Sequence, residues 1–306
     1  MGLRAAVLVL VAAALLAGWS GATPLSSQST TASGAPPLPA ATTTGDSAEE
    51  LPPGVNETGI EDASELVEAH EAALVETGFA FGFEANVTVG PARQFTAVSG
   101  RVESGLSPLV VESASERDLG DGPTAVGTDL WANETTVAVQ YDREGRDQLR
   151  RYNRSGGEFG VPDETWAHLP RADLKSQVTN AWLIELALAA GEYDLERVDD
   201  RDGERVAVLR ATEAAAAANL TDLDSTVVVD EEGRVRELSL TAAYEGEEPT
   251  TEVRYEFELT EVGGVSVERP AWVAEAEPPG EANETTATPG GGTPVPSRAT
   301  ATPSGD

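Results

Sequence analysis

The first regular pattern in the chain is an amphipathic helix between Asp62 and Gly78. Its less polar positions recur every three or four residues, which is the spacing of one helical face. Those positions are Leu66, Val67, His70, Leu74 and Thr77. Asp62 can cap the first turn, with Glu65 three residues later as in a capping box, and Gly78 can end the helix. We therefore expect a helix that buries one face.

Alternation of period two follows this helix directly. Phe79, Phe81, Phe83, Val87 and Val89 face one way, and Glu84, Asn86 and Thr88 face the other. The pattern returns at 251–260, where Val253, Tyr255, Phe257 and Leu259 alternate with Glu252, Arg254, Glu256 and Glu258. Such alternation is typical of strands with one buried face and one solvated face. The pattern predicts two strands, the first with a phenylalanine stripe on its covered side.

Weaker patterns supply the remaining elements. Strands are expected at 94–102, 109–117, 125–131 and 136–141, and hairpins pair 193–198 with 205–210 and 226–230 with 235–244. A second helix is expected from about Leu174 to Ala190, with Asp173 as its cap and Gly191 at its end. Its second half is apolar nearly all round, so it must be covered on more than one side. A short alanine-rich helix is expected at 212–218.

These elements together predict an α+β fold. About nine antiparallel strands and two substantial helices indicate a curved antiparallel sheet, an open half-barrel, with helices packed on one face. The segment 60–276 is long enough to form this as a single domain. The flanking segments 23–59 and 277–306 are rich in Thr, Pro and small residues. They cannot bury enough apolar area to offset the entropy of ordering, so we expect disordered tethers.

Residues 1–22 have the pattern of a signal peptide. One positive charge in the first four residues precedes the apolar run from Ala5 to Gly18. A helix of this length spans about 21 Å, short of the ~30 Å hydrocarbon core of a bilayer, which favours a signal peptide over a membrane span. The sequence thus predicts export to the cell surface or the medium, with membrane tethering if the signal is not cleaved.

The end of this apolar run, Leu16-Ala17-Gly18-Trp19, resembles a lipoprotein lipobox with Trp19 in place of the cysteine. A diacylglycerol anchor needs the thiol, so no lipid can be attached here. Two interpretations stay open: a coincidental Leu-Ala-Gly in a signal peptide, or a relative of lipoproteins that has lost its anchor. The chain contains no cysteine, which also excludes disulfides and thiol catalysis.

Asparagine usage supports exposure to a glycosylation machinery. Six of the seven asparagines open an Asn-x-Ser/Thr sequon. They are Asn56, Asn86, Asn133, Asn153, Asn219 and Asn283. Roughly one residue in six is Ser or Thr, so chance alone predicts about one sequon. Asn86 falls on the polar side of its strand, and none of the six lies on the phenylalanine face. We expect these residues to be glycosylation sites.

The charge of the chain is strongly acidic. The formal net charge is −33, and Lys175 is the only lysine against 19 arginines. Dense carboxylates with little lysine are a habit of proteins from saturated-salt environments, where the Debye length falls to about 3 Å and screens self-repulsion. We expect the domain to lose structure as salt is lowered. The same charge argues against nucleic acid and against direct adsorption to anionic membranes.

Several segments resemble an exported haloarchaeal lipoprotein family of unassigned function. The resemblance covers about residues 60–276, and that family usually begins with a lipobox, from which this chain departs at Trp19. It rests on His70-Glu71-Ala72-Ala73-Leu74, on the hairpin Val227 to Val235 (VVVDEEGRV), and on the ending Thr260 to Val273 with Glu268-Arg269-Pro270-Ala271-Trp272-Val273. The layout is also similar to the half-barrel of the bacterial lipoprotein carriers (LolA/LppX-like), which implies a curved sheet that holds acyl chains against helices.

The sequence contains no complete motif for metal, nucleophilic or nucleotide-dependent catalysis. His70-Glu71 begins a His-Glu-x-x-His zinc motif, but Leu74 occupies the second histidine position and His168 is the only other histidine. We interpret His70 as a surface or helix-packing residue. No nucleophile elbow, phosphate loop or dinucleotide glycine pattern is present. The sequence predicts a protein that is not an enzyme and has no cofactor.

One acidic cluster could suggest calcium. Asp199, Asp200 and Asp202 precede Gly203, but the twelfth position counted from Asp200 is Ala211 rather than glutamate. We interpret the cluster as an acidic hairpin turn, so no metal site is expected.

The best functional candidate is apolar. Phe79, Phe81 and Phe83 form one wall, and Trp182 and Leu186 from the second helix can form the opposite wall. If the sheet closes tightly on the helices these five residues are core; if it stays open they line a pocket for a lipid or isoprenoid chain. We expect a monomer. Two alternatives without a small ligand are a structural or adhesion glycoprotein and an accessory sensory domain of a membrane protein partner.

Overall fold

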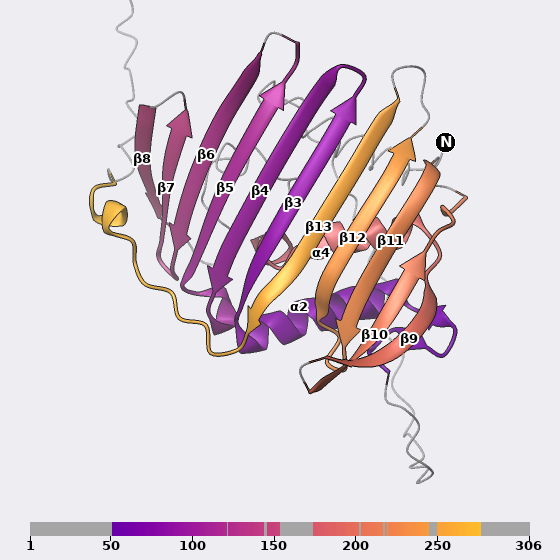
Figure 1. Cartoon of the computed structure of the whole chain (residues 1–306). Helices are drawn as coiled ribbons and strands as arrows, with labels where there is room; N and C mark the ends of the chain where they lie inside the picture. Colours follow the sequence, from indigo (N-terminus) through magenta and orange to yellow (C-terminus); the bar gives the residue numbers. More distant parts are fainter. Residues whose placement is uncertain are drawn as a thin grey trace, which may run out of the picture.

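The computed structural model describes residues 51–120, 122–143, 146–153, 174–201, 203–216, 218, 220–244 and 250–276. This part of the chain forms one antiparallel sheet of 13 strands in the order β1-β2-β9-β10-β11-β12-β13-β3-β4-β5-β6-β7-β8. β1 and β8 are its two ends, so the sheet is open, and the helices lie on one face (Figure 1). The predicted α+β fold with an open antiparallel sheet is confirmed.

The sheet consists of two meanders joined side by side. The N-terminal meander is β3 (Phe79–Val89), β4 (Ala92–Val102), β5 (Leu109–Asp118), β6 (Pro123–Ala132), β7 (Thr136–Arg143) and β8 (Arg146–Asn153). The C-terminal meander is β9 (Asp194–Arg201), β10 (Glu204–Ala211), β11 (Leu220–Asp230), β12 (Val235–Tyr244) and β13 (Thr251–Val262). β3 and β13 form the seam, with Phe83 opposite Phe257 and Ala85 opposite Tyr255. The two alternating segments of the sequence are therefore neighbours.

The side-chain facing of the seam strands agrees with the prediction. Phe79, Phe81 and Phe83 are buried, and Glu84 and Asn86 on the same strand are exposed. On β13, Val253, Tyr255, Phe257 and Leu259 are buried. Their polar neighbours point to the face of the sheet that carries no helix.

The first helix, α2 (Ala63–Thr77), has the predicted ends. The Asp62 carboxylate accepts hydrogen bonds from the backbone N–H groups of Ser64 and Glu65, at 2.9 and 3.1 Å. Gly78 ends the helix with a φ of 72°, where a side chain would collide with the backbone of Ser104. The buried positions of α2 are Leu66, His70 and Leu74.

The sequence predicts one continuous second helix, and this is wrong. The structure has two shorter helices, α3 (Leu174–Val178) and α4 (Ala181–Ala190). Asn180 between them has a left-handed φ of 58°, which asparagine tolerates better than most residues. The Thr179 carbonyl oxygen meets His70 Nε2 at 2.8 Å, so a side chain of α2 binds the backbone at the break. The proposed cap Asp173 lies outside the described residues, while Gly191 ends α4 as expected.

α4 is covered nearly all round, as its composition predicts. Its buried residues are Ala181, Trp182, Leu183, Ile184, Leu186, Ala187, Leu188 and Ala190. Glu185 and Ala189 are exposed.

Two other expectations are wrong. The described residues of 212–218 form no helix, because Ala214 pairs with Gly191 as an isolated bridge and Ala215 N–H donates to the Ala190 carbonyl. Residues 51–59 also do not belong to a disordered tether. They hold β1 (Val55–Asn56) and begin β2 (Gly59–Ile60), which pairs with β9 at Asp194. These backbone hydrogen bonds offset the ordering entropy that composition alone leaves uncompensated.

The segment after β13 runs along the lower edge of the helix-free face of the sheet and leads to the 3₁₀ helix η3 (Ala271–Ala274) beside β7 and β8 (Figure 1). It covers a second small core that contains Trp131, Ala138, Val265, Val267, Val273 and Ala276. The Glu103 carboxylate accepts a hydrogen bond from Val267 N–H at 2.8 Å, and the Arg269 guanidinium lies 5.4 Å from the Trp131 ring centroid. The folded part of the chain thus extends at least to residue 276. A second 3₁₀ helix, η1 (Ser104–Leu106), lies near the end of α2.

Candidate functional site

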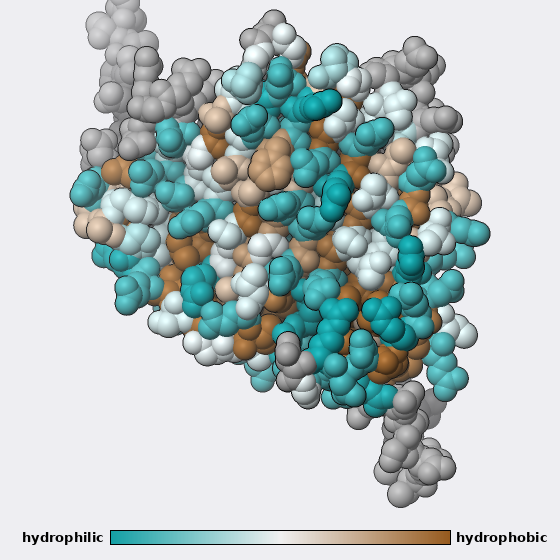
Figure 2. All heavy atoms as spheres, in the orientation of Figure 1, coloured by the Kyte–Doolittle hydropathy of each residue, from teal (hydrophilic) through white to brown (hydrophobic). Residues whose placement is uncertain are grey.

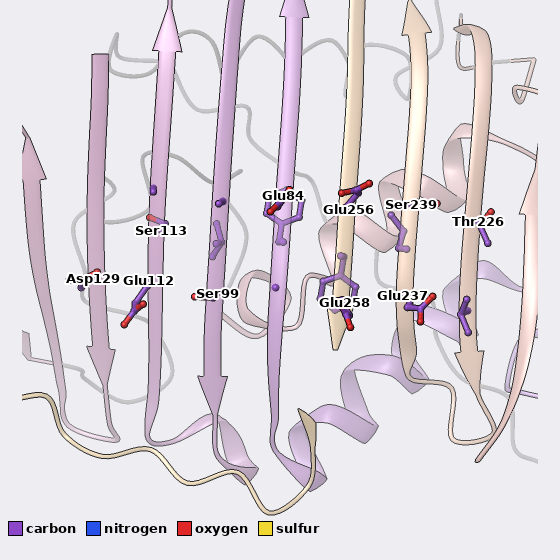
Figure 3. A pocket seen from close by; sticks show the side chains of 18 residues that line it. Glu84, Ser99, Glu112, Ser113, Asp129, Thr226, Glu237, Ser239, Glu256 and Glu258 are labelled. Carbon is purple, nitrogen blue, oxygen red and sulfur yellow. The ribbon is translucent and has the colours of Figure 1, made fainter. Parts of the chain in front are cut away.

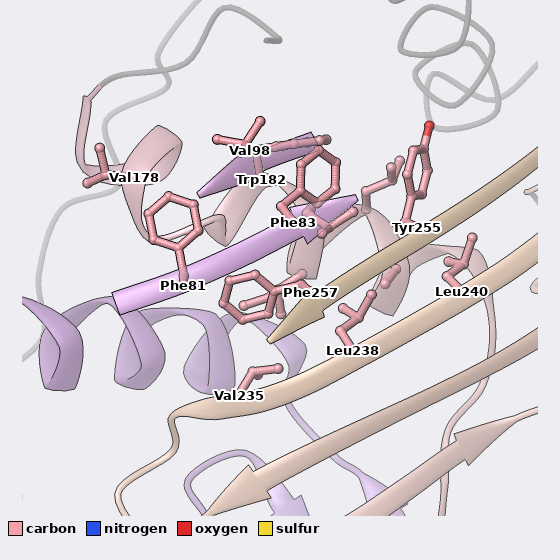
Figure 4. Packing of buried hydrophobic residues seen from close by; sticks show 14 of the residues in the cluster. Phe81, Phe83, Val98, Val178, Trp182, Val235, Leu238, Leu240, Tyr255 and Phe257 are labelled. Atoms are coloured by element: carbon pink, nitrogen blue, oxygen red, sulfur yellow. The ribbon is translucent and has the colours of Figure 1, made fainter. Parts of the chain in front are cut away.

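The structure brings the five predicted ligand-lining residues into one apolar layer between the sheet and the helices. Figure 4 shows three of them, Phe81, Phe83 and Trp182. β3 contributes Phe79, Phe81 and Phe83, and α4 contributes Trp182 and Leu186. Their exposed fractions are 0, 3, 2, 9 and 7%. The Phe83 and Trp182 rings meet edge to face with centroids 5.8 Å apart. The layer is therefore closely packed where these residues meet, and ligand binding by them stays a prediction.

Two hydrogen-bond donors inside this layer lack acceptors. The indole Nε1 of Trp182 and the hydroxyl of Tyr255 are buried without a partner in the described part of the protein. Both side chains pack on Phe83. Trp182 meets the Phe83 ring edge to face, and the Tyr255 ring, which comes from β13, stacks on it with centroids 6.2 Å apart. Burial raises the pKa of the Tyr255 hydroxyl far above its usual range, so it stays a protonated donor. A buried donor without an acceptor costs about 1–3 kcal/mol, which makes this pair a feature to be explained.

Beside the apolar layer, the inward face of the sheet turns polar. Gln94 and Thr96 on β4, Ser113 and Ser115 on β5, and Thr128 on β6 occupy alternating positions of the buried face. Thr96 Oγ1 lies 3.3 Å from Gln94 Nε2 and 3.2 Å from Ser115 Oγ, but Gln94 Oε1 is buried without a partner among the described residues. Ala85 on β3 pairs with Tyr255 on β13 and with Thr96 on β4, so Thr96 and Tyr255 lie two strands apart. The interior is thus amphipathic.

Sequence reasoning missed Tyr255 and Gln94 as candidates. Tyr255 appeared only as one apolar member of an alternating strand, and its unpaired hydroxyl is visible only once its neighbours are known. Gln94 was the first residue of an expected strand, without a signal for its direction. The one sequence signal was the tyrosine itself, because a hydroxyl at a position predicted to be buried needs a hydrogen-bond partner.

His70 is a helix-packing residue, one of the two interpretations that the sequence left open. It is fully buried, Nε2 lies 2.8 Å from the Thr179 carbonyl oxygen, and Nδ1 accepts a hydrogen bond from Val235 N–H at 3.0 Å. Burial lowers its pKa to about 4, so the ring is neutral, with the proton on Nε2. Both nitrogens are engaged, which leaves none for a metal. The described ranges contain no group of three His, Asp or Glu residues that could hold a metal ion, and His168 lies outside them.

The acidic cluster at the end of β9 is only partly described by the structure. Asp199 and Asp200 are exposed on β9, opposite Val206 and Arg205, and Asp202 lies outside the described residues.

On the helix-free face a shallow acidic groove of about 850 Å³ crosses the seam (Figure 3). Its carboxylates are Glu84, Glu112, Asp129, Glu237, Glu256 and Glu258, with Ser99, Ser239 and Thr226 between them. Glu84 is directly opposite Glu256, and Glu237 opposite Glu258. Like charges directly opposite each other destabilise a sheet. Hydrophilic residues are spread over this face with hydrophobic ones between them (Figure 2), as on a solvated surface.

The sequons fall away from the apolar layer wherever the structure describes them. Asn86 is exposed on the helix-free face, as predicted, Asn133 lies in the turn after β6, and Asn153 ends β8. Asn56 ends β1 rather than lying in a tether, and its Oδ1 accepts hydrogen bonds from Thr58 N–H and Gly59 N–H in the following turn, at 2.8 and 3.1 Å. Asn219 and Asn283 lie outside the described residues. Their glycosylation stays a prediction.

Comparison with known proteins finds similarity mainly at the level of fold. Residues 197–276 match the model of a family of unknown function (DUF7537). This range covers most of the C-terminal meander and the segment that runs along the lower edge of the helix-free face. No curated protein matches the chain.

Solved structures with a similar layout include LprF from Mycobacterium bovis, with 10% identity and a TM-score of 0.32 over 68% of this chain and 95% of that one. A LolA superfamily protein from Nitrosomonas europaea has 10% identity and a TM-score of 0.21 over 68% and 94% of the two chains. A putative outer membrane lipoprotein-sorting protein domain from Vibrio parahaemolyticus has 10% identity and a TM-score of 0.21 over 69% and 96%. At scores this low the likeness carries nothing further about this chain.

None of the helices in the described ranges combines the length and the apolar character needed to cross a bilayer.

Proposed function

We propose that this protein is an exported, non-enzymatic binding protein that holds a hydrophobic ligand, such as a lipid or isoprenoid chain, between its open sheet and its helices. One observation carries the proposal: Trp182 Nε1 and the Tyr255 hydroxyl are buried without acceptors around Phe83, in an otherwise apolar layer. A layer that served only as core would be more stable with Phe at position 255, because the hydroxyl costs desolvation and gains nothing. A ligand that enters the layer can satisfy these donors.

The position of α4 suits such binding. α4 packs beside α2 and over β11 and β12, and it contacts β3 through the Trp182 and Phe83 rings. A shift of α4 away from β3 would open the layer without breaking a strand pair. Trp182, Leu186 and Leu188 on α4 keep a small exposed fraction, so this helix borders the surface.

Export and glycosylation complete the proposal. They are supported by the apolar run at residues 5–18 and by six sequons, none of which is described on the phenylalanine face. We propose a monomer at the cell surface or in the medium. Glycopeptide mapping of protein from its native host tests this part: glycans at Asn86 and Asn133 are expected, and a chain that is bare at every sequon would contradict it.

The binding itself is tested by native mass spectrometry of protein purified in molar salt, followed by organic extraction and uptake of a fluorescent lipid. A matched pair of variants on α4 sharpens the test. Leu186→Trp adds volume inside the layer and is expected to abolish uptake, whereas Glu185→Trp adds a similar volume on the exposed side and is expected to leave uptake intact. If both variants are folded and take up the lipid equally, the layer is not the binding site.

One observation favours a second function without a small ligand. All five predicted lining residues are at most 9% exposed, as in an ordinary core. A structural or adhesion module, or an accessory domain of a membrane protein partner, needs nothing more than this core. A stoichiometric protein in a pulldown from native membranes, together with an extract free of lipid, would favour this alternative.

A further inference from the structure

Trp182 Nε1, the Tyr255 hydroxyl and Gln94 Oε1 are buried without a partner on the helix-covered side of the described sheet, and each restricts the chemistry of the ligand; a further unpaired donor, Trp131 Nε1, lies in the second core on the other face. Trp182 Nε1 can only donate a hydrogen bond, and the Tyr255 hydroxyl has its proton available. Both belong to rings that contact Phe83, one edge to face from the helix side and one stacked from β13. Figure 4 shows the Tyr255 side chain standing away from β13 with its hydroxyl at the far end. Acceptor oxygens of a ligand that lies beside Phe83 are therefore the natural partners of these two groups.

We infer that the ligand is a neutral amphiphile whose uncharged oxygen atoms accept hydrogen bonds from Trp182 Nε1 and the Tyr255 hydroxyl. This inference rests on the proposed function and specifies the chemistry of its ligand. An ester carbonyl, an ether oxygen or an alcohol would each meet the requirement. A plain hydrocarbon would leave both donors unpaired.

The absence of charge follows from the sheet positions around the two donors. Along the register row through Tyr255, the inward residues are Ser225, Leu240, Ala85, Thr96 and Ser115. The next row, through Phe83, holds Val227, Leu238, Phe257, Val98 and Ser113. Between β11 and β5 these two rows contain no charged side chain, and the nearest charged residue at an inward position is Arg117 on β5, opposite Gln94 in the neighbouring row. A carboxylate or phosphate held there would be desolvated without a counter-charge, which is costly.

The unpaired Gln94 Oε1 indicates the size of the polar head group of the ligand. Gln94 Oε1 is a buried acceptor on β4, two strands from β13, which corresponds to roughly 10 Å between the strands. A ligand that also carries a hydroxyl can donate to Gln94 Oε1 while its acceptor oxygen meets Tyr255. Thr96 and Ser115 extend this polar surface along the Tyr255 row. A head group of several atoms with hydroxyls, continued by an apolar chain toward Phe81, fits all three groups.

The test compares three fluorescent probes of equal chain length on the full chain in molar salt: a monoacylglycerol, a fatty acid at neutral pH, and an alkane. The monoacylglycerol is expected to bind most tightly. Tyr255→Phe keeps the ring and removes the hydroxyl, so it is expected to weaken monoacylglycerol binding about tenfold and to leave the alkane unchanged. Trp182→Phe is expected to act in the same direction.

Tyr193→Phe is the matched control. Tyr193 is buried in the same core, but its hydroxyl already bonds Ser225 Oγ at 2.7 Å and the Ala187 carbonyl at 3.1 Å. Its removal is expected to lower stability without changing the preference between monoacylglycerol and alkane.

The outcomes separate the inference from the proposed function. Equal affinity for the three probes, or tighter binding of the fatty acid, would overturn the inference and leave hydrophobic binding standing. Unchanged monoacylglycerol affinity in a folded Tyr255→Phe variant would also overturn it. If no probe binds to the wild-type chain and no lipid co-purifies, both proposals fail.

Discussion

His70 Nε2 lies 2.8 Å from the carbonyl oxygen of Thr179, and this contact joins α2 to the break between α3 and α4. The other ring nitrogen accepts the backbone N–H of Val235, the first residue of β12. One neutral imidazole therefore connects both helical segments to the C-terminal meander. The ring also meets Phe257 edge to face at 6.3 Å, so it is part of the apolar layer as well.

This arrangement predicts a loss of stability in acid. The pKa of His70 falls from 6.5 to about 4 on folding, because burial disfavours the charged ring. Between these values the unfolded chain binds a proton that the folded chain does not, so the free energy of unfolding decreases as pH falls from about 6.5 to about 4. The total loss is about 3 kcal/mol. Denaturant titrations in molar salt measure it.

Carboxylates also titrate in this range, so the control is His70→Gln measured at the same pH values. The difference between the two proteins is expected to shrink as pH falls through the window. A constant difference from pH 7 to pH 4 would show that His70 does not titrate as described.

The buried ion pair at the β11–β12 turn gives a second prediction. Asp230 accepts hydrogen bonds from Arg234 Nε at 2.7 Å and from Arg234 N–H at 2.9 Å, and both residues are buried. Asp230→Ala is expected to cost about 3 kcal/mol, because among the described residues it leaves the buried guanidinium ion-paired only with the exposed Glu232. Asp224→Ala, which breaks the exposed pair with Arg210, is expected to cost under about 1 kcal/mol. Equal costs in denaturant titrations would contradict the burial argument.

The seam predicts a dependence on salt. Glu84 faces Glu256 and Glu258 faces Glu237 across strand pairs. Lowering salt from about 1 M to about 0.1 M lengthens the Debye length from about 3 to about 10 Å, so repulsion at these pairs grows. The domain is expected to lose its circular-dichroism signal in dilute buffer. Glu84→Gln with Glu258→Gln is expected to move the midpoint to lower salt, and an unchanged midpoint would place the repulsion elsewhere.

Two glycines on neighbouring strands test the packing of Phe81. A Cβ at Gly100 would lie 2.3 Å from Phe81 Cε1, whereas a Cβ at Gly82 would meet nothing within 4 Å. Gly100→Ala is therefore expected to destabilise by about 1–3 kcal/mol, since the ring must move within a packed layer. Gly82→Ala is expected to be neutral or slightly stabilising. Thermal unfolding of both variants gives the comparison.

The elements that sequence reasoning predicts well are those with a strong period. Phe79 to Val89 and Val253 to Leu259 alternate cleanly, and their facing is confirmed. The break at Asn180 was not predictable, because the side chain that binds the backbone there, His70, is more than a hundred residues away in the sequence. β8, with the sequence RDQLRRYN, has no alternation because it is an end strand rich in charge, as edge strands often are.

The candidate site was predictable only in its apolar half. The phenylalanines and Trp182 follow from period and composition. Tyr255 and Gln94 stand out because each has a buried polar atom without a hydrogen-bond partner among the described residues. A sequence alone does not show which polar atoms lack a partner.

The strand order has a consequence for how the chain folds. Within each meander every strand pairs with its neighbour in sequence, so both can form through local contacts. The complete sheet then depends on β3 meeting β13, where Val89 pairs with Thr251 across most of the domain. Closing so long a loop is slow compared with forming hairpins. Joining the two meanders is thus expected to be the rate-limiting step of refolding, and it is also the step that creates the layer between Phe83 and Tyr255.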